Sequence, residues 1–358
     1  MRSRCLWFFA ACLGLWTAAV SAAAFKDPVV TPAPAAPGDV STAPLLAGAL
    51  SGGRIVAVGL RGLIISSDDQ GKSWQQRPSP LSSDLVALSF VGNGKGWAAG
   101  HDGVILHTDD GGNSWTRQLD GQAACKIMAD YYQKKADAGD ASVAPYIAMI
   151  QGNCSDGGGD LPWLDVYFTD ESNGYAVGPF GNIIASADGG KTWEPWMHRI
   201  DNEAGLHLNQ ITVINGALYI AAERGTVFKY DEGEQKFKPH RTGYNGTFFG
   251  ITGDAAKLVV YGLRGTAYRS LDGGETWTAV QTEAGAAVNA AATLADGRIA
   301  MVTQNARVLV STDAQAEHYK PLQLARPMLF ADIVPVGPSA FAVIGTAGVV
   351  IESAAAGN

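Results

Sequence analysis

One short motif recurs along this chain and constrains its fold more than any other feature. It reads Ser/Thr-x-Asp-x-Gly-x-Ser/Thr-Trp and is found at residues 67–74, 108–115, 186–193 and 270–277. Each copy follows a run of β-forming residues that contains a glycine turn. Self-similarity at a spacing of about 40 residues, with several strands per unit, is typical of a β-propeller. The repeat therefore predicts an all-β array and suggests that the motif serves the scaffold.

A glycine turn before the third strand of each unit allows the units to be counted. The aligned pairs are Arg61-Gly62, Asp102-Gly103, Phe180-Gly181, Arg224-Gly225, Arg264-Gly265, Asn305-Ala306 and Ala347-Gly348. Short alternating runs bounded by Gly and Asp read as antiparallel strands, four to a unit. We therefore predict a seven-bladed β-propeller of four-stranded antiparallel blades, forming a single domain over residues 25–358.

The last unit is shorter than the others. Its third strand ends near Ile351-Glu352-Ser353, which leaves no room for a fourth strand. A sheet edge left open is a liability, so a propeller ring is expected to close. We expect the segment 25–30, or the proline-rich stretch after it, to supply the outer strand of the last blade.

The motif, called here the Asp box, suits the turn between the third and fourth strands. Its Asp can accept backbone N–H groups, its Gly permits positive φ, and its Trp can pack between blades. Calcium binding is the alternative, but a calcium loop needs more carboxylates than the one or two present in each box. We assign a structural role, with no metal and no cofactor, to Asp68, Trp74, Asp110, Trp115, Asp188, Trp193, Asp272 and Trp277.

The N-terminus has the features of a secretory signal peptide. Arg2 and Arg4 precede an apolar stretch and then small residues, so we place the signal peptide at 1–24. Its removal leaves Cys125 and Cys154, an even pair in an exported protein, for which a disulfide is expected and a zinc site is the weaker alternative. We expect a periplasmic or otherwise exported location, or the thylakoid lumen if the host is photosynthetic.

The spacing of the units is interrupted once, between the second and third turns. The intervening insertion covers about 120–162, and its segments 126–135 and 143–150 have helical periodicity. A connection between blades lies on the face opposite the boxes. The insertion is either a disulfide-clipped helical cap over the propeller mouth or a decorated loop without a role.

Charged residues also gather at the turns of that second face. Arg61, Arg224 and Arg264 occupy the aligned turn position, and His101 lies one residue earlier in blade 2. The formal net charge of −8 argues against a general nucleic-acid binder. In an acidic protein these groups would form a local anion site for a partner; the alternative is solvated turn arginines. On the innermost strands, Asp165, Asn289 and Asp332 are expected to line the channel.

The boxes and their spacing resemble the BNR/Asp-box repeat proteins. The whole pattern, with signal peptide, glycine turns and seven units, most resembles the photosystem II stability/assembly factor-like family over essentially all of the mature chain. The resemblance implies an arginine-rich patch that holds a protein client. In a non-photosynthetic Gram-negative host, relatives look like periplasmic accessories of membrane systems, including RND-type exporters.

The sequence favours a binding protein over an enzyme. A sialidase would need an arginine triad, a nucleophilic tyrosine and a carboxylate, but the F-R-I-P motif of that family is absent near the start. No G-x-S-x-G, H-E-x-x-H or phosphate loop is present. We predict a monomeric, non-enzymatic binding or assembly protein whose partner is a membrane protein, an RND-type exporter or a photosystem component. The alternative is a sialidase-like glycoside hydrolase or carbohydrate-binding propeller.

Overall fold

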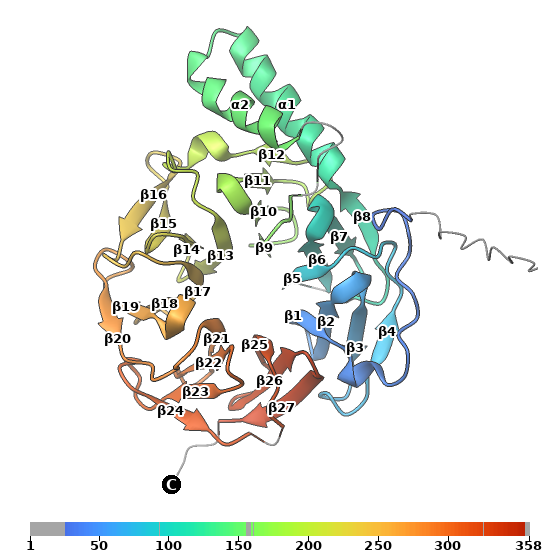
Figure 1. The fold of residues 1–358 in the computed structure, drawn as a ribbon, viewed down its shortest axis with the longest axis vertical. Coiled ribbons are helices and arrows are strands. Elements are labelled where there is room, and N and C mark those ends of the chain that lie inside the picture. Colours follow the sequence, from blue (N-terminus) through green and yellow to red (C-terminus); the bar gives the residue numbers. More distant parts are fainter. Residues whose placement is uncertain (1–25, 93, 155–158, 160, 325, 355–358) are drawn as a thin grey trace, which may run out of the picture.

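Seven antiparallel sheets form a ring around a central axis in the computed structural model (Figure 1). The structure describes residues 26–354, apart from 93, 155–158, 160 and 325, so the expected signal peptide lies outside the described residues. Six sheets have four strands and one has three within this part of the chain. The first strand of each sheet is innermost, as in Figure 1. The predicted seven-bladed β-propeller is confirmed.

The strands follow one another from the axis outward in every blade. Blade 1 contains β1 (Leu45–Ser51), β2 (Arg54–Gly59), β3 (Ile64–Ser67) and β4 (Gln75–Arg77), and blade 2 contains β5 (Leu85–Val91), β6 (Lys95–Gly100), β7 (Ile105–Thr108) and β8 (Thr116–Leu119). Blade 3 contains β9 (Asp165–Phe168), β10 (Gly174–Val177), β11 (Ile183–Ser186) and β12 (Glu194–Pro195). Blade 4 contains β13 (Leu208–Ile214), β14 (Ala217–Ala222), β15 (Thr226–Asp231) and β16 (Lys236–Arg241). Blade 5 contains β17 (Phe248–Gly253), β18 (Leu258–Gly262), β19 (Ala267–Ser270) and β20 (Thr278–Val280). Blade 6 contains β21 (Val288–Thr293), β22 (Ile299–Thr303), β23 (Val308–Ser311) and β24 (Tyr319–Leu322). Blade 7 contains β25 (Phe330–Pro335), β26 (Ala340–Gly345) and β27 (Gly348–Ser353).

Helices are confined to turns and to the insertion within the described chain. The single-turn 3-10 helices are η1 (Val40–Thr42), η2 (Leu60–Gly62), η3 (His101–Gly103), η4 (Ala141–Val143), η5 (Pro179–Gly181), η6 (Met197–Arg199) and η7 (Leu263–Gly265). The α-helices are α1 (Gly121–Asp137) and α2 (Ala144–Asn153). None of these helices is both long enough and apolar enough to cross a membrane.

The second strand of each blade carries most of the core. In β2 and β26, every residue after the first is buried, and both strands are nearly continuous apolar runs. Such a run is expected where a strand is covered on both faces, here by the two neighbouring blades. The innermost strands instead alternate, as in β5, where every other residue from Leu85 to Ser89 is buried.

The four box turns share one hydrogen-bond pattern. The first hydroxyl of the box donates to the carboxylate and accepts the N–H of the glycine four residues later. The carboxylate also accepts the N–H and the hydroxyl of the residue before the Trp. The carboxylates in this role are Asp69, Asp110, Asp188 and Asp272.

The first box corrects one assignment, because its carboxylate is Asp69 and not Asp68. Asp69 accepts the N–H of Ser73 at 2.9 Å and its hydroxyl at 2.6 Å. The hydrogen bonds from Ser73 and Ser67 lower the pKa of Asp69 to about 2. Asp68 instead forms an ion pair with Arg54, 2.6 Å from Nε to Oδ1. In each box it is the Asp at the third position of the motif that accepts the hydrogen bonds closing the turn.

Each box Trp packs towards the preceding blade. Trp115 of blade 2 belongs to one buried cluster with Val56 and Val58 of blade 1. Trp193 of blade 3 shares a cluster with Ile105 of blade 2. The indole N–H donates to the carbonyl of the box glycine for Trp74, Trp115 and Trp277. The Trp therefore fastens its own turn and closes the gap between two blades.

The ring closes without a shared strand in the described chain, so the expected donation of an outer strand by the N-terminal segment is wrong. That segment lies along blade 1, where the Ser82 N–H donates to the Pro28 carbonyl and the Ala33 N–H to the Ser79 carbonyl. Closure comes from packing of blade 1 on blade 7, where Leu45 shares a buried cluster with Ile344. The proline-rich stretch cannot offer a regular ladder of N–H donors to β27.

Polar side chains of three innermost strands join neighbouring blades. They occupy equivalent positions and accept the backbone N–H of the matching residue in the next blade: Asp165 from Ile211 at 2.9 Å, Gln210 from Ile251 at 2.6 Å and Asp332 from Gly48 at 2.9 Å. The last of these bonds links blade 7 to blade 1. Burial raises the pKa of Asp165 to about 7 and that of Asp332 to about 6.

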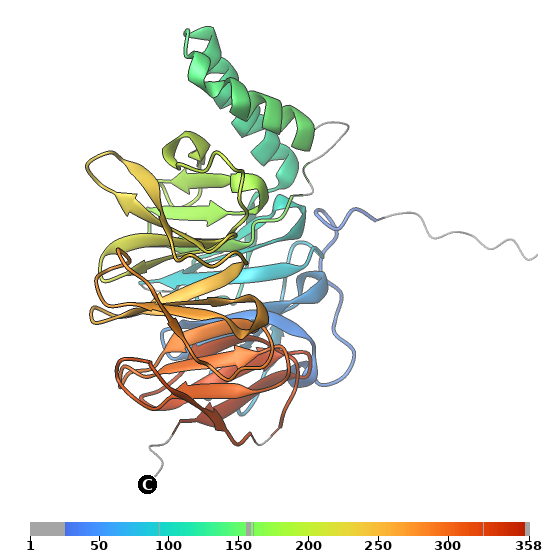
Figure 2. The ribbon, with the colours of Figure 1, turned by 60° about the vertical axis from the view of Figure 1, so that its left-hand side comes forward.

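The insertion forms a helical hairpin between blades 2 and 3. A disulfide joins Cys125 in α1 to Cys154 at the end of α2, as predicted. The hairpin projects from the outer side of the ring and does not cover the central channel (Figures 1 and 2). The interpretation of the insertion as a cap over the propeller mouth is therefore wrong. The reason is that α1 packs along the outer strand of blade 3, where Met128 and Tyr132 are buried.

The adjacent aspartates of the first box provide a matched test of the box. We expect Asp69→Ala to lower Tm by several degrees, because the turn loses three hydrogen bonds to one carboxylate. Asp68→Ala removes two ion pairs, with Arg54 and Arg77, of an exposed carboxylate and should change Tm little. Thermal denaturation followed by circular dichroism measures both. Equal losses for the two variants would contradict the assignment of Asp69.

Because of the two partly buried channel aspartates, Asp165 and Asp332, we expect stability to depend on pH. Their folded-state pKa values lie above the ordinary value near ~4, so between roughly pH 4 and 7 the folded chain binds more protons than the unfolded chain. This contribution to the free energy of unfolding therefore rises as the pH falls from 8 to 5. The Asp165→Asn and Asp332→Asn variants should lack it, so the stability of the wild type relative to either variant increases towards pH 5. Parallel curves in urea denaturation across this range would refute the assignment.

Candidate functional site

The chain connections divide the propeller into two faces. Turns between the first and second strands lie beside the boxes, as where the Gly111 N–H donates to the Gly94 carbonyl at 2.8 Å. Turns between the second and third strands lie beside the connections between blades, as where the His101 N–H donates to the Asp84 carbonyl at 2.9 Å. We call this second surface the turn face. It carries all four predicted partner-binding residues.

The turn-face arginines hold an unusual backbone conformation. Arg61, Arg224 and Arg264 have φ of 55°, 52° and 61°, in the left-handed region. The glycine after each is required, since a Cβ on Gly62 would lie 2.2 Å from the Leu81 carbonyl oxygen. The turn thus directs the arginine side chain away from the blade. All three arginines are exposed, and their guanidinium groups have no protein partner within the described chain.

The predicted residues follow an arc over blades 1 to 5 and do not form a single cluster. Arg61 and His101 lie on blades 1 and 2, and Arg224 and Arg264 on blades 4 and 5, with blade 3 between them (Figure 1). The Asp84 carboxylate lies beside the first of them and accepts the backbone N–H of Arg61 at 2.7 Å. The arc offers several separated cations, which suits an extended partner better than one small anion.

Exposed apolar side chains share this face. The large hydrophobic residues that are at least two-fifths exposed there are Leu60, Phe180, Leu263 and Leu329. They make up four of the six such residues within the described chain. Mixed apolar and arginine surface is typical of protein-binding sites. The turn face is therefore the best candidate for an interaction surface.

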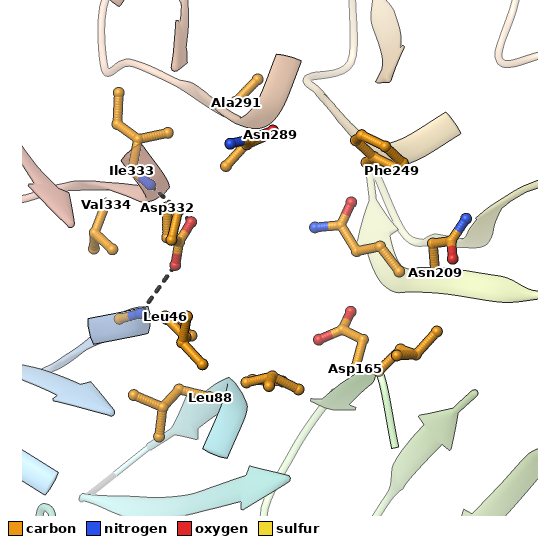
Figure 3. A pocket seen from close by; sticks show the side chains of 18 of the residues that line it. Leu46, Leu88, Asp165, Asn209, Phe249, Asn289, Ala291, Asp332, Ile333 and Val334 are labelled. Atoms are coloured by element: carbon orange, nitrogen blue, oxygen red, sulfur yellow. Dashed lines mark hydrogen bonds between the residues drawn. The ribbon is translucent and has the colours of Figure 1, made fainter. Parts of the chain in front are cut away.

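The central channel is the second candidate. It encloses a cavity of about 360 Å³ lined by the innermost strands, and Asp165 faces Asp332 across it (Figure 3). Asn289 also lines it, as expected from the sequence, and donates to the Phe330 carbonyl at 2.7 Å. These polar groups are already bonded to backbone of the next blade, so they serve the ring. The described residues contain no group of three metal-ligating side chains.

Bulges place two asparagine side chains at the axis. In six innermost strands the pairing register shifts near the start of the strand. A bulge adds one residue and re-aims the side chains around it. Asn209 and Asn289 occupy the extra position in blades 4 and 6, and each bonds a carbonyl of the next blade at 2.7 Å.

The hairpin is attached to blade 3 through α1. The Tyr131 hydroxyl donates to Glu194 at 3.0 Å, and the Tyr132 hydroxyl lies 3.1 Å from His198 Nδ1. Burial lowers the pKa of His198 to about 4, so the ring is neutral at pH 7. Burial also raises the pKa of Tyr131 to about 12. These bonds hold α1 against the blade.

One residue of the arc was overlooked in the sequence. Phe180 is the blade 3 counterpart of the arginines, with φ of 59° and a residue exposure of 43%. The alignment of the glycine turns could have revealed it, because Phe180 is the aromatic residue at a turn position that does not require one. Its ring lies 4.9 Å from that of His207.

Comparison with protein families identifies the chain. The model described as photosynthesis system II assembly factor YCF48 matches residues 51–125 and 159–357. The interval between the two matches contains most of the helical hairpin. No curated protein matches the sequence.

Solved structures agree on the fold. YCF48 bound to D1 peptide has a TM-score of 0.63 at 16% identity, over 88% of this chain and 94% of that chain. YCF48 from Cyanidioschyzon merolae has a TM-score of 0.62 at 17% identity, over 88% and 97%. The GH74 enzyme of Niastella koreensis has a TM-score of 0.61 at 15% identity, but only 53% of its chain is covered. Identities this low show a shared fold and no more.

The family match covers well over half of the chain and includes strands of all seven blades. The resemblance expected from the boxes is thereby confirmed. The chain belongs to the photosynthesis system II assembly factor YCF48 family.

Proposed function

We propose that this protein is an exported, non-enzymatic assembly factor that holds an extended segment of a membrane-protein partner on its turn face. The observation that carries the proposal is the arc of exposed arginines whose side chains have no partner among the described residues, interspersed with exposed apolar side chains. A client segment with carboxylates would pair with the arginines, since guanidinium groups bind carboxylates through two parallel hydrogen bonds.

Family membership supports an assembly role over catalysis. A relative of the same fold has been solved bound to D1 peptide. By analogy, the client here is a segment of a membrane complex, either a photosystem component or, in a non-photosynthetic host, a transporter of the RND type. The disulfide is consistent with work in an oxidising compartment, the periplasm or the thylakoid lumen.

The arginine arc predicts a charge-dependent affinity. We expect the double variant Arg61→Ala, Arg264→Ala to bind a client segment roughly tenfold more weakly, because two guanidinium–carboxylate contacts are lost. Fluorescence anisotropy with labelled D1 peptide, and in parallel with labelled periplasmic segments of an RND-type exporter, measures the affinity. The difference should shrink at high ionic strength.

The control removes the same charge from the other face. Lys72 and Lys191 are exposed residues of the boxes, so Lys72→Ala, Lys191→Ala lowers the net charge equally without touching the turn face. This variant should bind like the wild type. Equal weakening of both double variants would mean that only net charge matters, and an absence of binding to either class of peptide would refute the proposal.

A further inference from the structure

We propose that a cavity between α2 and the blade 3 turn is a specificity pocket, which binds one large apolar side chain of the client segment. This inference rests on the proposed function and adds to it a second, chemically different contact. The occupant is an extended segment of the partner with an aromatic or large aliphatic residue near a carboxylate.

The cavity has apolar walls and a buried apolar floor. It measures about 440 Å³. Tyr146 and Met149 of α2 form one wall, and Phe180 of the blade 3 turn forms another. The floor is Met197 and Ile200, which are only 2% and 5% exposed. A site of this size and lining suits the side chain of a bound residue rather than solvent.

Three charged residues also line the cavity: Asp201 and Glu203 of the connection between blades 3 and 4, and Lys236 of β16. Lys236 forms an ion pair with Asp201 at 3.2 Å, so its charge is already compensated. An anionic occupant would therefore gain little there, whereas an apolar one would be removed from water. Two methionines adapt to occupants of different shape. The pocket is thus expected to select for apolar character and size.

Phe180 links the pocket to the arginine arc. A bulky residue in the left-handed region is unfavourable, and its partial exposure means that the core does not require it. Its ring lies 4.9 Å from that of His207, whose backbone N–H donates to the Glu223 carboxylate at 2.9 Å. Arg224 directly follows Glu223 in the chain. A segment with its apolar residue in the pocket would therefore bring a neighbouring carboxylate towards Arg224.

The wall formed by α2 is peculiar to this chain's insertion. Residues 126–158, which include all of α2, lie outside the stretches matched by the family model. The disulfide and the contact of Tyr146 with Tyr132, 5.1 Å between ring centroids, hold α2 against α1. The pocket is therefore a feature by which this protein would select a client different from those of relatives without the hairpin.

The first experiment tests the pocket without a client. N-acetylphenylalaninamide at millimolar concentration is titrated into the full mature chain carrying 13C-methyl methionine. We expect shifts of the Met149 and Met197 methyl signals and none for Met301, which is fully buried in blade 6. In Met149→Trp, which fills the cavity, the Met197 signal should no longer respond. Absence of shifts in the wild type, or a response of Met197 that survives filling, would overturn the proposal.

The second experiment uses the peptide that binds in the anisotropy assay. Phe180→Ala should weaken its binding roughly tenfold, whereas Leu271→Ala should not, because Leu271 is an exposed leucine of the Asp box at 270–277, on the opposite face. Replacing the single apolar anchor of the peptide by Ala should cause the same loss, and combining it with Phe180→Ala should add little more.

The outcomes separate the two proposals. Weakening by Arg61→Ala, Arg264→Ala but not by Phe180→Ala or Met149→Trp would overturn the pocket and leave the proposed function standing. Weakening by Phe180→Ala and Leu271→Ala alike would also overturn it, because it would indicate that the loss of any exposed apolar side chain weakens binding. If no peptide binds but the amide probe does, the proposed function fails and the pocket remains.

Discussion

The structure depends on one requirement, that every blade must bury both of its faces against its neighbours. The second strands satisfy it with apolar residues on both sides, as in β2 and β26. Hydrophobic burial of this kind has no direction, so it cannot by itself set how far one blade is displaced along the next. Near the axis, the hydrogen bonds of Asp165, Gln210 and Asp332 to the following blade fix the position of one blade relative to the next. Nearer the rim, the large rings of the box Trp residues pack against the preceding blade and fill the space between the two blades.

This division of labour explains where function can lie. Groups in the channel are committed to holding the ring, even though they are polar and include two carboxylates with raised pKa values. The boxes are committed to their own turns. The exposed side chains at the aligned position of the turn face have neither duty, because glycine, backbone bonds and carboxylates such as Asp84 and Glu223 hold the turns. The exposed side chains of this face are free to vary, and here they include arginine, leucine and phenylalanine.

The candidate site was only partly predictable. The aligned turn position correctly placed Arg61, Arg224 and Arg264 on one face, since equivalent positions in repeated units point the same way. Phe180 occupies that position too, yet its importance depends on α2, which reaches it from an insertion with no counterpart in the other blades. No periodicity in the chain relates Met149 to Phe180, so only the packing of the hairpin brings them to one cavity.

By itself, the sequence determined the number of blades, the strand order within them and the pairing of Cys125 with Cys154, because each rests on local spacing or on simple counting. The spacing of the motif also identifies Asp69, and not Asp68, as the Asp of the first box. Tertiary structure alone decided that the hairpin lies outside the ring and that the N-terminal segment follows blade 1. Both depend on contacts between residues far apart in the chain, such as Tyr132 with His198 and Pro28 with Ser82. Such contacts leave no local pattern, because many surfaces of similar polarity compete for the same segment.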